Sequence, residues 1–267
     1  MSDSFHAIVA DLAAEHAALA QALEGVPFER WEKETHAPGW AVRDHVAHLA
    51  QFDDVARLAI EDEERFQAQA RARRPEAPGA DPAYMVEARL KPAAEVLGWW
   101  HEANEKLVAA AQRIDPARRL PWFGPPMAAT SFITARLMEC WSHGLDVVDV
   151  AGGEREPSDR LRHIAHLGVR TRNFSYVTRG LEPNATPIKV ELVLPSGEPL
   201  LFGDAQGKQS IRGRAIDFCM VVTQRRHYLD TGLEIDGADA EEWMRLAQAF
   251  AGPPGAGRTE GQFAKGS

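Results

Sequence analysis

Cysteine is nearly absent from this chain of 267 residues, which contains only Cys140 and Cys219. Two cysteines exclude a framework of several disulfides and any metal site made of cysteines alone. Long apolar runs are missing as well, since no stretch approaches the roughly 20 residues that a membrane span needs. We therefore do not expect an integral membrane protein.

Basic residues are too few for a protein whose main partner is nucleic acid. Lys and Arg number 30 against 39 Asp and Glu, so the formal net charge is -9. Nucleic-acid binding draws most of its affinity from clustered Lys and Arg that neutralise phosphates. The segment MSDSFHAIVADLAAEH has acidic residues where a signal peptide carries basic ones, which favours a cytoplasmic protein. We expect a small-molecule partner and neither nucleic acid nor a membrane, and a homodimer stays open.

Helical periodicity dominates the first half of the chain. Apolar residues at helical spacing predict long helices at about 3–24, 41–70, 82–113 and 127–151. Pro92 kinks the third of these helices or marks its true beginning. Segments rich in Pro and Gly separate the four helices. Consecutive amphipathic helices are typical of a four-helix bundle, which we assign to residues 1–153.

The second half of the chain has a mixed pattern, beginning with a predicted helix at about 158–181. PIKVELVLPSGEPLLFG alternates apolar and polar residues around a Pro-Ser-Gly turn, which is typical of a β-hairpin. AIDFCMVVTQRR fits either a strand or a helix, LEIDG fits a short strand, and ADAEEWMRLAQAF fits a closing helix. We assign a small α+β domain to residues 154–251 and expect residues 252–267, which are poor in apolar side chains, to be disordered.

Four ionisable residues form one narrow stripe on the otherwise apolar fourth helix. They are spaced three, four and three residues apart: Arg136, Glu139, His143 and Asp146. Glu139 and His143, at i and i+4, suit two ligands of one metal ion held between adjacent turns. A helix-stabilising pair is the alternative, although buried charge is costly unless it is paired or coordinated. Arg136 can neutralise Glu139 or bind a substrate carboxylate.

A third ligand has to come from another helix, and RDHVAHL near the beginning of the second helix supplies two candidates. His45 and His48 are three residues apart, so both or only one can face the bundle interior. Asp44 lies one turn before His48 and can orient its imidazole. Asp146 can do the same for His143 or cap the end of its helix.

The two helices together carry the motifs of a known family. GWAVRDHVAHL and, later in the chain, ARLMECWSHGLDVVDVAG resemble the DinB-like superfamily, and within it the mycothiol-dependent maleylpyruvate isomerases. The resemblance implies a four-helix bundle that holds one divalent metal, usually zinc, through His48, Glu139 and His143. It assigns His48 rather than His45, because the ligand precedes the Leu of the AHL signature. Iron, nickel and manganese are alternatives to zinc at such a site.

The resemblance extends to the second domain. The isomerases carry a small α+β domain similar to sterol carrier proteins, with a G-x-A-x-D stretch that leads to an arginine. GRAIDFCMVVTQRR matches this stretch and ends at Arg225 and Arg226. An arginine of the second domain can hold a dicarboxylate substrate over the metal. We count Arg225 with Arg136 as a catalytic residue, and Arg226 stays open as the alternative to Arg225.

The resemblance implies a metal-dependent enzyme that activates a low-molecular-weight thiol for addition or transfer to a small electrophile, as an isomerase or a transferase. Metal binding converts a thiol to a nucleophilic thiolate near neutral pH. Two other functions stay open. One is a metal-dependent hydrolase that needs no thiol, and the other is a metal- or ligand-binding protein without catalysis.

Overall fold

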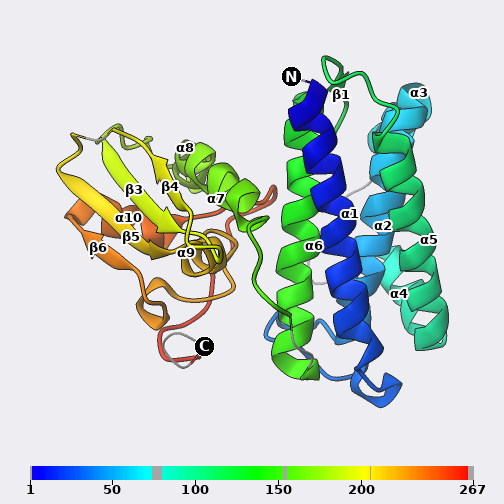
Figure 1. Ribbon diagram of the computed structural model, residues 1–267. Helices are drawn as coiled ribbons and strands as arrows, with labels where there is room; N and C mark the ends of the chain where they lie inside the picture. The colour runs from blue at the N-terminus through cyan, green and yellow to red at the C-terminus, as the bar shows by residue number, and fades with distance from the viewer. Residues whose placement is uncertain (1, 74–79, 153–154, 205, 264–267) are drawn as a thin grey trace. The chain divides into compact units, whose positions relative to one another are not determined.

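The chain consists of two compact units, residues 1–155 and 156–267. The computed structural model describes residues 2–73, 80–152, 155–204 and 206–263 (Figure 1). Within these ranges no helix is both long and apolar enough to cross a lipid bilayer. A mainly helical first unit and a mixed second unit confirm the predicted fold class.

The first unit is a helix bundle. Its helices are α1 (Ser2–Glu24), α2 (Val42–Glu61), α3 (Glu63–Ala72), α4 (Ala83–Arg89), α5 (Ala93–Ala111) and α6 (Ala129–Ala151), with a short 3-10 turn, η1 (Phe28–Arg30). The long helices α1, α2, α5 and α6 lie side by side (Figure 1). Two short antiparallel strands, β1 (Arg119–Leu120) and β2 (Met127–Ala128), precede α6. Leu49, Trp100 and Cys140 are among the fully buried side chains of the core.

Two of the four predicted helices are each divided in the structure. The second ends at Glu61, and Asp62 then accepts a hydrogen bond from the Arg65 backbone nitrogen at 3.0 Å and begins α3. A side-chain acceptor at this position satisfies a free N–H group at the helix start. In the third, α4 ends before Pro92, and α5 begins directly after it. Proline therefore marks the beginning of α5, where a missing N–H costs nothing.

The second unit contains a mixed sheet and its own helices. Its elements are α7 (Leu161–Arg170), α8 (Arg172–Val177), β3 (Ile188–Val193), β4 (Pro199–Phe202), β5 (Gln209–Arg214), α9 (Ala215–Val222), η2 (Tyr228–Asp230), β6 (Glu234–Asp236) and α10 (Ala238–Leu246). The strand order is β4-β3-β5-β6. The antiparallel pairing of β3 with β4 confirms the predicted hairpin. AIDFCMVV, which fitted either strand or helix, is the helix α9.

Two features of the second unit differ from the sequence prediction. The helix predicted at about 158–181 is divided into α7 and α8 at Thr171. The strand β5 was not predicted, yet it lies between β3 and β6 and runs parallel to β3. Residues 252–263, for which we predicted disorder, contain no helix or strand, although Gly261 N donates to Asp230 Oδ1 at 2.8 Å. The predicted tail continues over 264–267, which lie outside the described residues.

Candidate metal centre

A tight turn before α2 sets the beginning of this helix. In APGW, Trp40 N donates to Ala37 O at 3.0 Å, and Gly39 has a φ of 77°. Pro at the second position and a left-handed Gly at the third are the preferences of a type II turn. Directly afterwards, Asp44 Oδ2 accepts a hydrogen bond from Ala41 N at 2.9 Å and so caps α2. His45 and His48 therefore lie in the first two turns of the helix.

The three side chains that the family motifs indicate as ligands converge between α2 and α6. Glu139 Oε2 lies 3.2 Å from His143 Nε2 and 3.8 Å from His48 Nε2. The exposed fractions of the His48, Glu139 and His143 side chains are 17, 22 and 12%. One ligand atom from each lies within 4.8 Å of the others, so the group can hold a metal ion. These side chains are thus close together and partly exposed.

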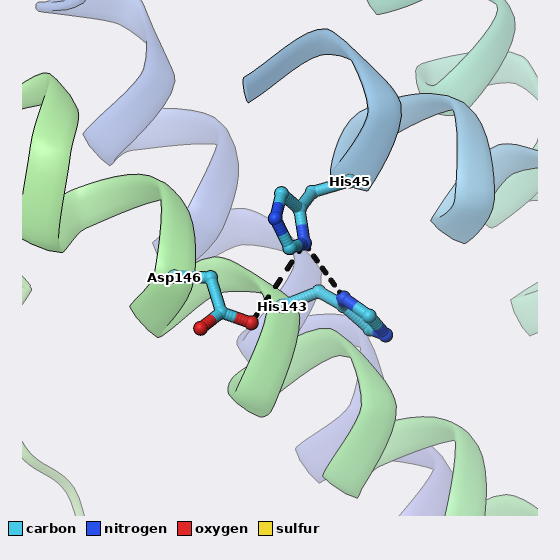
Figure 2. Close-up of side chains that lie close together, drawn as sticks. All are labelled: His45, His143 and Asp146. Carbon is cyan, nitrogen blue, oxygen red and sulfur yellow. Dashed lines mark hydrogen bonds and ion pairs between the residues drawn. The ribbon is translucent and has the colours of Figure 1, made fainter. Parts of the chain in front are cut away.

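A second group of possible ligands shares His143 and is more deeply buried. It consists of His45, His143 and Asp146, whose ligand atoms also lie within 4.8 Å of one another. Figure 2 shows His45 on α2 facing both residues of α6. His45 Nδ1 is 2.8 Å from His143 Nδ1 and 3.8 Å from Asp146 Oδ2. The described residues therefore contain a candidate His/Asp triad directly beside the His/Glu group.

In the group of His48, Glu139 and His143, each imidazole has a hydrogen-bond partner at Nδ1, the nitrogen that faces away from Glu139. His48 Nδ1 is 3.0 Å from the Tyr84 hydroxyl, and His143 Nδ1 is the atom close to His45. His45 Nε2 is in turn 2.8 Å from Thr35 Oγ1. Such outer contacts normally orient histidines that bind metals. The arrangement leaves both Nε2 atoms, of His48 and His143, directed at Glu139.

Burial and neighbouring side chains shift the pKa values of His48 and Glu139. Removal from water, followed by the nearby His143, lowers the pKa of His48 to about 4. Burial by itself raises the pKa of Glu139, but hydrogen bonds with His143 and His48 outweigh it and hold that pKa well below its ordinary value. A neutral His48 and an ionised Glu139 at neutral pH are the forms that bind a metal ion.

Asp44 has a different partner from the one expected. Its carboxylate oxygens accept hydrogen bonds from Arg89 Nε and Nη2 at 2.9 and 3.0 Å. This ion pair and the helix cap occupy the carboxylate of a residue that is 1% exposed. We expected Asp44 to orient the imidazole of His48. In the structure, the Tyr84 hydroxyl contacts this imidazole instead.

Arg136 likewise lies elsewhere than the sequence suggested. Its Nε and Nη2 donate to Asp53 Oδ1 at 3.1 and 3.0 Å, and the two side chains are 4 and 1% exposed. The guanidinium pairs with Asp53 rather than with Glu139, because Asp53 projects from the buried face of α2. An acidic residue in apolar spacing with Val46, Leu49 and Ile60 was the signal for such a partner.

Arg225 belongs to the second unit. Its Nη1 donates to the Thr223 carbonyl at 2.6 Å. The role that we assigned to it at the metal site stays a prediction. The same applies to the ligand roles of His48, Glu139 and His143, for which the geometry provides support.

Aromatic rings lie beside His48 and His143 within the first unit. The Trp40 ring stacks on His143 with centroids 5.6 Å apart and an interplanar angle of 12°. The Phe52 ring lies 4.6 Å from that of His48. From Phe52, ring contacts continue to Trp122 and Phe123 at 6.4 and 6.3 Å. The surface beside His48 is therefore aromatic.

Both cysteines of the chain are expected to be unreactive in the folded protein. Cys140 and Cys219 are 0% exposed, and burial raises the pKa of each thiol. A thiol reacts through its thiolate, so both conditions suppress reaction. A chromogenic disulfide reagent should titrate neither thiol in the native protein and both in denaturant. Rapid native reaction of either cysteine would contradict this expectation.

Comparison with known proteins gives a family, two relatives and two solved structures to which this chain is similar. Residues 12–148 match the family described as mycothiol maleylpyruvate isomerase N-terminal domain. Two uncharacterized proteins of Mycobacterium tuberculosis, Rv0036c of strain H37Rv and MT0041 of strain CDC 1551, are 43% identical over 94% of this chain and 97% of their own length. The crystal structure of the mycothiol-dependent maleylpyruvate isomerase superposes with a TM-score of 0.55 at 13% identity, over 83% of this chain and 90% of that one. A mutant of that isomerase gives a TM-score of 0.53.

Proposed function

The chain belongs to the mycothiol maleylpyruvate isomerase N-terminal domain family, as its two helix motifs predicted, and from this premise we propose a metal- and thiol-dependent enzyme. It activates a low-molecular-weight thiol for addition or transfer to a small electrophile. The observation that carries the proposal is the convergence of His48 Nε2, Glu139 Oε2 and His143 Nε2 on one point.

Ligand spacing supports this group over the one that contains His45. Two nitrogens at the usual zinc distance in a tetrahedral site lie about 3.3 Å apart. The 3.2 and 3.8 Å separations around Glu139 are near that value. The 2.8 Å between His45 Nδ1 and His143 Nδ1 is instead the length of a hydrogen bond. His143 therefore offers Nε2 to the metal and uses Nδ1 for His45.

Two histidines and one carboxylate fit a divalent ion with open coordination positions. Zinc is the metal we propose, with iron, nickel or manganese as alternatives. When bound, such an ion lowers the pKa of a coordinated thiol or water. The chain's own residues then have distinct tasks. Glu139 offsets the positive charge, and the stacked Trp40 ring holds the plane of His143.

The reacting thiol has to come from outside the protein. Cys140 and Cys219 are buried, and their raised pKa values disfavour the thiolate. A small thiol has access to the His48, Glu139 and His143 side chains, which are partly exposed. The apolar rings of Phe52 and Tyr84 beside His48 offer a surface for the substrate.

The proposal is tested by turnover in the presence and absence of metal and thiol. Purified protein, stripped and reloaded with zinc, is assayed with an activated cis-alkene and with alkylating electrophiles, each with and without mycothiol. We expect turnover of at least one electrophile only when both zinc and the thiol are present. Hydrolysis at a rate independent of thiol would contradict the proposal, as would zinc binding without any turnover.

A further inference from the structure

We infer that His45 is a positioning residue: it fixes the tautomer of His143, so that the Nε2 lone pair of His143 points at the metal. This inference rests on the proposed metal site. The family motif does not assign His45 as a ligand. The chain of contacts runs from the Trp40 carbonyl through Thr35 and His45 to His143.

The direction of the first hydrogen bond follows from the chemistry of the carbonyl group. Thr35 Oγ1 lies 2.9 Å from Trp40 O, which can only accept, so the Thr35 hydroxyl proton is committed to that oxygen. Thr35 Oγ1 also accepts a hydrogen bond from Ala37 N at 3.2 Å. Towards His45, the hydroxyl therefore presents a lone pair. His45 Nε2, at 2.8 Å, must carry the proton and donate it.

The direction of the hydrogen bond between His45 and His143 follows from that of the first one. A neutral imidazole with a proton on Nε2 has a lone pair on Nδ1. With His45 neutral, its Nδ1 accepts and His143 Nδ1, at 2.8 Å, donates, while Asp146 Oδ2 lies farther from the same atom of His45, at 3.8 Å. With that proton on Nδ1, the Nε2 lone pair of His143 is available to a metal ion bound beside Glu139, whose Oε2 lies 3.2 Å from the same nitrogen. This is the tautomer that binds a metal ion through Nε2.

Burial makes it costly to reverse the directions of these hydrogen bonds. His45 is 0% exposed and Thr35 is 7% exposed, so water does not readily replace a lost partner. If His143 carried its proton on Nε2, two lone pairs would face each other between the imidazoles. A buried polar contact of that kind loses the hydrogen bond and its compensation for desolvation. The Trp40 ring, with its centroid 5.1 Å from that of His45, holds the ring in place as well.

The other histidine ligand, His48, has a partner of a different kind. His48 Nδ1 contacts the Tyr84 hydroxyl, which can rotate and either donate or accept. Tyr84 lies on α4 rather than on the turn before α2. The hydrogen-bond directions around His45 therefore favour one tautomer of His143, whereas the Tyr84 contact by itself favours neither tautomer of His48.

The test compares variants that remove single links of the chain. His45→Phe removes both hydrogen bonds, and Thr35→Val removes the hydroxyl with little change of shape. Thr35→Ser keeps the hydroxyl and serves as the matched control. Zinc affinity is measured by competition with a chromogenic chelator, and thermal unfolding of the metal-free proteins checks that each variant folds.

We expect zinc affinity to fall by about 10- to 100-fold in His45→Phe, the usual cost of losing a partner behind a metal ligand. The loss should be smaller in Thr35→Val and absent in Thr35→Ser. Equal affinities in all four proteins would overturn the inference and leave the metal site intact. Loss of zinc in His45→Phe and Asp146→Asn, but not in Glu139→Gln, would show that His45 is itself a ligand and would overturn the inference too.

Protonation is also observed directly. Two-bond proton–nitrogen correlation spectra of the imidazole rings, recorded on metal-free and zinc-loaded protein, should show protons on Nε2 of His45 and on Nδ1 of His143. The opposite tautomers would contradict the inference. A wild-type chain that binds no zinc would refute the proposed function, while these spectra of the metal-free protein would still decide the role of His45.

Discussion

A Glu139→Gln variant is expected to lose its metal and, with it, turnover. The substitution keeps the shape of the side chain but removes the anionic oxygen that lies nearest to both His143 and His48. Loss of an outer partner costs about 10- to 100-fold in metal affinity, and loss of a ligand should exceed that. Metal content after dialysis and competition with a chelator measure the effect.

Two carboxylates on the same helix provide controls for Glu139→Gln. Asp149 lies outside both candidate groups, so the Asp149→Asn variant should retain the metal. Asp146→Asn removes the carboxylate of the group that contains His45, and we expect it to keep most of the affinity. Metal retained in Glu139→Gln but lost in Asp146→Asn would place the centre in the other group.

Replacing Arg136 by methionine is expected to destabilise the helical unit strongly. Arg136 and Asp53 form an ion pair with exposures of only 4 and 1%. Removal of Arg136 leaves the Asp53 carboxylate buried with only His16 Nε2 near it, 3.6 Å from Oδ2, and breaking a buried ion pair typically costs about 3–5 kcal/mol in the free energy of unfolding. Urea denaturation followed by circular dichroism measures this loss.

A double variant separates the ion pair from other roles of Arg136. Asp53→Leu combined with Arg136→Met removes both charges, so most of the lost stability should return. Arg57→Met on α2 breaks the more exposed pair with Glu61 and should cost only about 0.3–0.5 kcal/mol. If Arg136 served only to bind substrate, Arg136→Met would weaken substrate binding without changing the unfolding curve.

The sequence predicted those parts of the site that depend on one helix. Glu139 and His143 share a face because they are four residues apart, and this holds for any α-helix. Which of His45 and His48 faces α6 depends on how α2 is rotated in the bundle, which spacing alone does not determine. In the structure both do, because the apolar face of α2, with Val46 and Leu49, packs into the core and sets the rotation of the helix.

Partners from other elements could not be predicted in the same way. The carboxylate of Asp44 meets Arg89 at the end of α4, and Arg136 on α6 meets Asp53 on α2. Both contacts depend on the relative placement of helices distant in sequence. Tyr84 and Thr35 lacked a local signal, because their contacts with His48 and His45 arise only from the packing of α2.

The fold was predictable where local patterns are long. The long bundle helices and the β3–β4 hairpin follow from periodicity over many residues. The division at Asp62 was missed because acidic residues are also common inside exposed helices. The strand β5 has a short, polar sequence, and its place depends on the hydrogen bonds that β3 and β6 supply.

The most direct test of the metal centre is an anomalous difference map of zinc-loaded crystals, recorded above the zinc absorption edge. We expect one peak at bonding distance from Nε2 of His48, Nε2 of His143 and the carboxylate of Glu139, with His45 Nδ1 still hydrogen-bonded to His143 Nδ1. A peak bound by His45 and Asp146, or zinc bound away from both groups, would contradict this expectation.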